Sequence, residues 1–188
     1  GRVVRPPPAD LMLHDLGPHG RVLLARNTSS RGMAGRAPGA AEEQSLSWLD
    51  WTFPNDISAD GGAVLFTEQG EGGGSDYAVF LRPMRGGAAV RIGEGNACDL
   101  SADGRLVLTR AQGAPALLVY PTGAGTSRRI PLDGIRPIIG RFSSPDHAFL
   151  WAGKQDGTTG YFDVDLASGS ARELGGVTPP SGGAPLSP

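Results

Sequence analysis

Apolar residues in this chain occur in short runs that alternate with turn-forming residues, not at the spacing of long helices. Each run is bounded by Gly, Pro, Asp or Ser, which is typical of short strands joined by tight turns; the clearest runs are "RVLLA", "AVLF", "LVLT" and "AFLW". The 188 residues include 30 glycines and 16 prolines, about a quarter of the chain. Long helices are disfavoured at that density of helix breakers. The sequence therefore predicts an all-β protein.

One turn and strand pattern recurs along the chain. The sequence "DISADGGAVLF" begins at Asp56, and "DLSADGRLVLT" begins at Asp99, 43 residues later. In the Ser-x-Asp-Gly turn, Asp bonds its own backbone and Gly supplies the positive φ that a hairpin needs. Weaker copies occur at Gly17 ("GPHG"), Ser144 ("SPDH") and Ser187 ("LSP"). The successive spacings are 41, 43, 43 and 43 residues, which indicates a repeat protein.

Each repeat contains four short segments separated by turns. Four antiparallel strands every 40–45 residues or so is the period of a propeller blade, which buries its faces by stacking on neighbouring blades. We expect a β-propeller fragment of about four blades, each with four antiparallel strands in a repeat of ~43 residues. The expected parts are the last strand of a preceding blade (1–8), blade 1 (9–50), blade 2 (51–95), blade 3 (96–134), blade 4 (135–176) and a linker with the start of a next blade (177–188).

Two blades are expected to be less regular than the others. His19 replaces the Asp of the first turn, and His147 replaces the Gly of the fourth, where the preceding residues "GRFSS" slip by one position. The chain also begins at Gly1, without a signal peptide, so we expect an upstream part. We expect the segment to belong to a propeller of about six to eight blades. The alternative is that two copies pair as a homodimer and complete an eight-bladed ring.

The charge and the hydropathy of the chain bear on which classes of partner it can bind, and its cysteine content bears on the cellular compartment. The formal net charge is −2, and the charges are scattered without a basic stripe. The sequence therefore predicts no nucleic-acid binding, and without an apolar run of about 20 residues it predicts no direct membrane contact from this segment. The single cysteine, Cys98, cannot form an internal disulfide, so the cysteine content does not indicate an oxidising or a reducing compartment. We expect Cys98 to be a small buried apolar residue.

The sequence contains no convincing catalytic, cofactor-binding or metal-binding set. The loop "QGEGGGSDY" lacks the Gly-Lys-Ser/Thr of a phosphate loop, so an extended hairpin loop is favoured over a ligand-contacting one. Asp163 and Asp165 alternate on one strand and could hold calcium or act as acid and base, but turn roles are favoured. The three histidines (His14, His19 and His147) lack metal-ligand spacing. We expect this segment not to be an enzyme and to need no cofactor.

Four residues are candidates for partner binding. Trp48 and Trp51 lie between the last strand of one blade and the first strand of the next. Aromatic side chains there are expected to wedge between blades, and the alternative is a binding hot spot, where Trp is enriched. Glu71 and Asp76 lie in the most distinctive loop of the chain, "QGEGGGSDY". Trp151 occupies an apolar-run position and is expected in the core.

The turn followed by an apolar triplet resembles the TolB-type, WD-repeat-like propeller repeat of bacteria, over nearly the whole chain. The segment "SLSWLDWTFPNDISADGGAVLFTEQGEGGGSDYAVFLR", with "AVRIGEG", is similar to the propeller region that follows the kinase domain in some large bacterial serine/threonine kinases. The resemblance implies a non-catalytic module that binds a protein, peptide or other ligand, or serves as a sensor or scaffold, in a larger bacterial signalling protein. It favours an extracytoplasmic (periplasmic) location, with the cytoplasm as the alternative.

Two other functions remain open on the same residues. The chain resembles the propeller that gates substrate entry in serine peptidases of the prolyl-oligopeptidase type, whose hydrolase domain would lie outside it. It also resembles a TolB-like envelope component that binds proteins by itself. Propellers host unrelated activities, so the repeat predicts the fold more strongly than the function.

Overall fold

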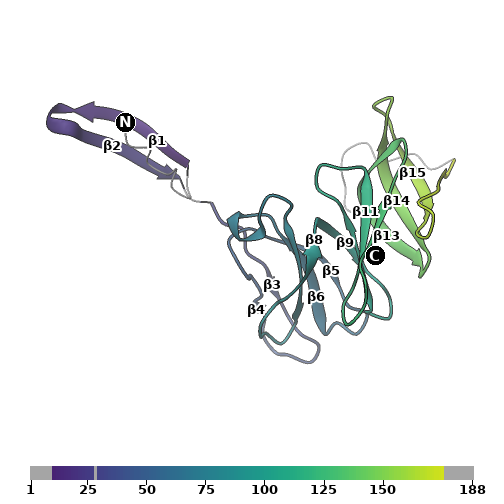
Figure 1. The fold of residues 1–188 in the computed structure, drawn as a ribbon. Coiled ribbons are helices and arrows are strands. Elements are labelled where there is room, and N and C mark those ends of the chain that lie inside the picture. The colour runs from purple at the N-terminus through teal and green to yellow at the C-terminus, as the bar shows by residue number, and fades with distance from the viewer. Residues whose placement is uncertain (1–9, 28, 176–188) are drawn as a thin grey trace.

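The computed structural model describes residues 10–27 and 29–175, and these residues form short antiparallel strands (Figure 1). Three sheets have four strands each, and every strand pairs with its neighbours in sequence. Blade 2 contains β5 (Thr52–Ile57), β6 (Ala63–Glu68), β7 (Ala78–Pro83) and β8 (Val90–Glu94). Blade 3 contains β9 (Asn96–Leu100), β10 (Leu106–Arg110), β11 (Ala116–Pro121) and β12 (Arg128–Pro131). Blade 4 contains β13 (Ile135–Ser144), β14 (His147–Lys154), β15 (Thr159–Asp165) and β16 (Ala171–Glu173). The predicted all-β propeller architecture is confirmed.

The Ser-x-Asp-Gly turns connect the first and second strands of blades 2 and 3. Ser58 Oγ donates to Asp60 Oδ1 at 2.6 Å and accepts from Ala63 N at 2.9 Å. Gly61 has φ 67°, and its N–H donates to the carbonyl of Ser58. The hydrogen bond from Ser58 lowers the pKa of Asp60. The same bonds recur 43 residues later in the turn at Ser101, so the repeated sequence is a structural turn.

The fourth turn is irregular, as the sequence predicted. The pairing of β13 with β14 has a register shift between Phe142 and Ser144, and Ser144 then pairs with His147 across a two-residue turn. In the first turn, His19 itself adopts φ 63°, inside the short 3-10 helix η1 (Pro18–Gly20). Both departures therefore lie where a histidine replaces a turn residue.

The blades pack face to face, and the second strand of blade 2 is more deeply buried than that of blade 4. Leu65 and Val79 of blade 2 pack on Ala97, Leu100 and Val107 of blade 3. A larger cluster joins blade 3 to blade 4. Strand β6 of blade 2 is buried on both faces, whereas β14 of blade 4 alternates between buried and half-buried residues. Blade 2 is therefore covered on both sides, and blade 4 is covered on one.

Trp151 is half-buried and lies on the less covered face of blade 4, so its expected place in the core is wrong. It pairs across the ladder with Tyr161, next to a stacked Phe149–Tyr161 pair whose ring centroids are 5.2 Å apart. The alternation of β14 places Ala148, Leu150 and Ala152 toward blade 3 instead, and these residues are fully buried. In β14, small and branched residues therefore face the interface with blade 3, and the aromatic residues Phe149 and Trp151 face the other side.

In the segment predicted as blade 1, the described residues 10–27 and 29–50 form two separate strand pairs. Strands β1 (Asp10–Gly17) and β2 (Arg21–Asn27) form a hairpin that extends away from the blades, at the purple end of Figure 1. Strands β3 (Ala34–Gly35) and β4 (Gln44–Ser45) form a second pair, which covers blade 2. The sequence around β3, "GMAGRAPG", is rich in Gly and Pro, which limits strand length. The segments predicted for 1–8 and 177–188 lie outside the described residues.

Candidate functional site

A buried glutamate positions the segment that contains both candidate tryptophans. Glu68 ends β6 and is completely buried. Its Oε1 accepts from Leu49 N at 3.1 Å, and its Oε2 accepts from Trp51 N at 3.3 Å. The Thr52 hydroxyl also donates to Oε1. One carboxylate therefore satisfies three donors, which are two N–H groups of the turn between β4 and β5 and the hydroxyl of Thr52, the first residue of β5.

Arg82 fixes the same segment from the other side. Its Nη1 donates to the carbonyls of Leu46 and Ser47 at 2.7 and 2.8 Å. The guanidinium carbon lies 5.3 Å from the centroid of the Trp48 ring, a cation–π distance. Trp48 therefore rests on a fixed cation and is 37% exposed. The expectation that Trp48 wedges between two blades stays a prediction, and the partner that the structure shows for its ring is an arginine of blade 2.

The glycine-rich loop packs along this segment. Residues 69–77 join β6 to β7 as an extended hairpin loop with one 3-10 turn, η2 (Glu71–Gly73). A Cβ added to Gly70 would meet Asp50, and one added to Gly72 would meet the Leu49 side chain. A Cβ on Gly73 would overlap the carbonyl of Glu68. These glycines therefore allow the loop to lie directly against residues 49 and 50.

The four predicted residues are only partly brought together. Trp48 and Glu71 are exposed at this edge of blade 2, beside Leu49, which is 43% exposed, and Asp50. Trp51 is half-buried, and its carbonyl accepts from Gln69 N at 3.0 Å. We call the exposed set of Trp48, Leu49, Asp50 and Glu71 the Trp48 surface. Asp76 lies at the far end of the loop, where its carbonyl accepts from Gly95 N at the entrance to blade 3.

Sequence reasoning missed Leu49, Glu68 and Arg82. The one available signal was the charge of Glu68 at the end of the apolar run "AVLFTE". A charged residue in such a run is seldom fully buried unless it is paired or hydrogen-bonded.

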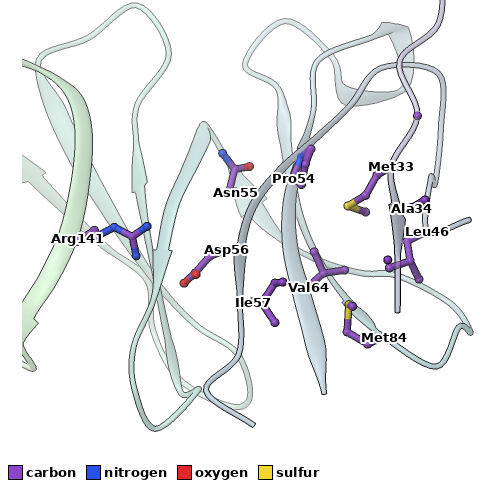
Figure 2. Close-up of a pocket in the computed structure, with 12 residues that line it drawn as sticks. Met33, Ala34, Leu46, Pro54, Asn55, Asp56, Ile57, Val64, Met84 and Arg141 are labelled. Carbon is purple, nitrogen blue, oxygen red and sulfur yellow. The ribbon is translucent and has the colours of Figure 1, made fainter. Parts of the chain in front are cut away.

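A separate groove of about 640 Å³ lies between β3 and β5 (Figure 2). Met33, Leu46, Val64 and Met84 line one side of the groove. Asp56 and Ile57 of β5 lie in its middle, and Arg141 of blade 4 lies at its other end. The lining is mostly apolar, so this groove suits an apolar segment better than a polar ligand.

A repeated carboxylate joins each blade to the next one. Asp56 Oδ2 accepts from Leu100 N at 2.9 Å, and Asp99 Oδ2 accepts from Phe142 N at 2.8 Å. Both aspartates stand two residues before the turn serine. Asp99 also lies 3.3 Å from Arg141 Nη1. Burial, with a smaller contribution from the nearby Asp56 charge, raises the pKa of Asp99 to about 6.

The remaining titratable residues act in turns and surface pairs. Asp163 pairs with His147 at 3.2 Å and Arg172 at 3.3 Å, whereas Asp165 accepts from the backbone of Ala167. Within the described residues, no group of three or more His, Cys, Asp or Glu side chains could hold a metal ion. Burial raises the pKa of the Cys98 thiol to about 11. In residues 10–27 and 29–175, no helix is long and apolar enough to cross a membrane.

Comparison with known proteins supports the fold. No protein-family model matches the chain, and no curated protein matches its sequence. Among solved structures, the chain is similar to one assigned as TolB from Agrobacterium tumefaciens, with a TM-score of 0.58 and 13% sequence identity. The similarity covers 87% of this chain and 59% of that one. The chain therefore has the fold of a TolB-like β-propeller and spans less than two thirds of the matched protein.

Proposed function

We propose that this chain is a non-catalytic propeller module that binds a protein or peptide partner through the Trp48 surface. The observation that carries the proposal is an exposed tryptophan held in place by a buried network. Trp48 lies over Arg82, and Glu68 bonds the backbone that follows Trp48. Tryptophan is the residue most enriched in binding hot spots, and a rigid aromatic loses little entropy when it binds.

The charge of the surface suggests the chemistry of the partner. Asp50 and Glu71 flank the exposed Trp48 and Leu49 side chains, and Asp76 lies further along the same loop. A peptide with an apolar anchor next to Lys or Arg would match an apolar centre with an acidic rim. Within the larger protein, the sequence resemblance supports a sensor or scaffold role in bacterial signalling.

Selection from a displayed peptide library tests the proposal. We expect the full chain to enrich peptides that carry basic and apolar residues. Trp48→Ala should weaken their binding by about tenfold or more, as removal of a hot-spot side chain does. Val90→Ala is the matched control, because Val90 is another exposed apolar residue of blade 2. Enrichment of peptides that bind the Trp48→Ala variant as tightly as the unmodified chain would contradict the proposal.

A TolB-like envelope component that binds proteins by itself is the second candidate. The fold similarity to the Agrobacterium structure supports it. The sequence that flanks the gene separates the two candidates. A kinase domain with a membrane span upstream supports the signalling role, and a secretory signal directly upstream supports the envelope role.

A further inference from the structure

The β1–β2 hairpin exposes an apolar surface that the other blades bury. Six large apolar side chains of this hairpin are exposed: Met12, Leu13, Leu16, Val22, Leu23 and Leu24. The residues that match Leu23 and Leu24 in the repeat are Val64 and Leu65 in blade 2 and Val107 and Leu108 in blade 3. Those four residues are at most 3% exposed, whereas Leu23 is 61% exposed. A lone two-stranded hairpin is marginally stable in water, so this hairpin needs a packing partner.

The groove beside β3 lies where the first two strands of a blade belong. In blades 2 and 3, the third strand pairs with the second strand on one side and the fourth strand on the other. Within residues 10–27 and 29–175, strand β3 pairs only with β4, so its other edge has no strand partner, and both residues of β3 line the groove. The middle of the groove contains Ile57 of β5, an apolar residue that is 54% exposed. An open strand edge next to an apolar wall matches a hairpin with apolar faces.

The inter-blade carboxylate supplies a specific contact for the hairpin. Asp15 stands two residues before the turn marker Gly17, in the same repeat position as Asp56 and Asp99. Asp56 and Asp99 accept from the backbone N–H groups of Leu100 and Phe142 in the next blade. Leu100 directly precedes the turn serine of blade 3, and the residue in the same position of blade 2 is Ile57, whose N–H in the groove is the donor for Asp15. Among the described residues, no side chain accepts from Ile57 N, and Asp15 accepts from its neighbour Leu16 N instead.

The connection to β3 is long enough for the hairpin to reach its own groove. Residues 28–33 join β2 to β3, and the equivalent connections are 111–115 in blade 3 and 155–158 in blade 4. The end of this connection is already in place, because Arg31 N donates to the carbonyl of Asp50 and Leu46 N donates to that of Met33. A short tether gives an effective concentration on the order of millimolar, which favours the chain's own hairpin over that of a second copy.

We propose that the β1–β2 hairpin docks in the groove of its own chain, where β2 pairs with the open edge of β3 and the Asp15 carboxylate accepts from Ile57 N. This docking completes a fourth blade with the strand order β1-β2-β3-β4. It covers the exposed apolar side chains of the hairpin together with Ile57.

Distance measurement between two spin labels tests the docking. Pro18 and Ala59 occupy equivalent turn positions in blades 1 and 2, and Ala59 and Ala102 are the equivalent pair in blades 2 and 3. All three side chains are exposed, so labels there leave the core intact. In a Cys98→Ala background, we expect the 18/59 pair to give the same short, narrow distance distribution as the 59/102 control pair. A long or broad 18/59 distribution would overturn the proposal.

Two further measurements separate docking in the same chain from exchange between copies. The labelled chain is refolded together with about a tenfold excess of unlabelled chain. If each hairpin docks in its own chain, this dilution should leave the short 18/59 distance unchanged. Loss of that distance on dilution would show that a second copy supplies the hairpin and would refute our assignment. In a urea titration of the 18/59 signal, Asp15→Ala should release the hairpin at lower urea, and the neighbouring His14→Ala should not. Equal midpoints for both variants would refute the role of Asp15.

Discussion

Replacing Glu68 tests whether one buried carboxylate holds the segment that carries the Trp48 surface. Glu68→Ala would leave three donors without their acceptor: Leu49 N, Trp51 N and the Thr52 hydroxyl. A buried donor that loses its partner costs about 1–3 kcal/mol. Residues 49 and 51 lie near the surface, where water can reach part of the gap, so we expect a total loss of about 3–5 kcal/mol. Glu68→Gln keeps one acceptor oxygen and should lose about 1–2 kcal/mol.

Urea denaturation followed by tryptophan fluorescence measures these losses, because Trp48 and Trp51 flank the affected backbone. Glu71→Gln is the matched control: it removes an exposed charge three residues later, and we expect a change below about 0.5 kcal/mol. Hydrogen exchange at the amides of Leu49 and Trp51 should accelerate in Glu68→Ala and not in Glu71→Gln. If the two variants have the same free energy of unfolding, the structural role assigned to Glu68 is wrong.

Two further predictions concern the interfaces between blades. Leu150→Ala removes a fully buried side chain between blades 3 and 4, and urea titration should show a loss of about 2–5 kcal/mol; a loss no larger than that of the exposed control Val90→Ala would contradict this packing. The pKa of Asp99 is raised from 3.8 to about 6, so the folded state holds its proton more tightly than the unfolded chain. The stability contributed by Asp99 is therefore fully present below about pH 4 and is lost as the pH rises through about 6. Asp99→Asn should remove that part of the pH dependence in unfolding titrations between these values, and an unchanged slope would contradict it.

The fold was largely predictable because the residues that form its turns and strands are close together in the sequence and recur in each repeat. Asp60 and Gly61 form the same turn as Asp103 and Gly104, and each pair can be recognised within a few residues of sequence. The slip before the fourth turn was also visible, because the residues "GRFSS" before this turn are displaced by one position relative to the other copies. The architecture of a repeat protein can be recognised from its sequence because each unit packs against its neighbours in the same way and so repeats the same residue pattern.

The candidate site was less predictable because its contacts join distant parts of the chain. Glu68 bonds Leu49 N from 19 residues away, and Arg82 reaches the carbonyl of Leu46 from 36 residues away. Neither contact leaves a periodic signal in the sequence. The extended position of the β1–β2 hairpin was also not predicted, because the repeat pattern predicts one continuous four-stranded unit there.

The two-sided burial of β6 has a consequence for how this protein unfolds. In a row of units that contact only their neighbours, stability is the sum of each unit's own contribution and those of its interfaces. Blade 2 takes part in two apolar clusters, one with β3 and β4 and one with blade 3. Hydrogen-exchange protection should therefore be highest at the amides of β6 and fall toward the half-covered face of β14. Blade 2 would then act as the nucleus that the other units join, and among blades 2 to 4 fraying would begin at blade 4.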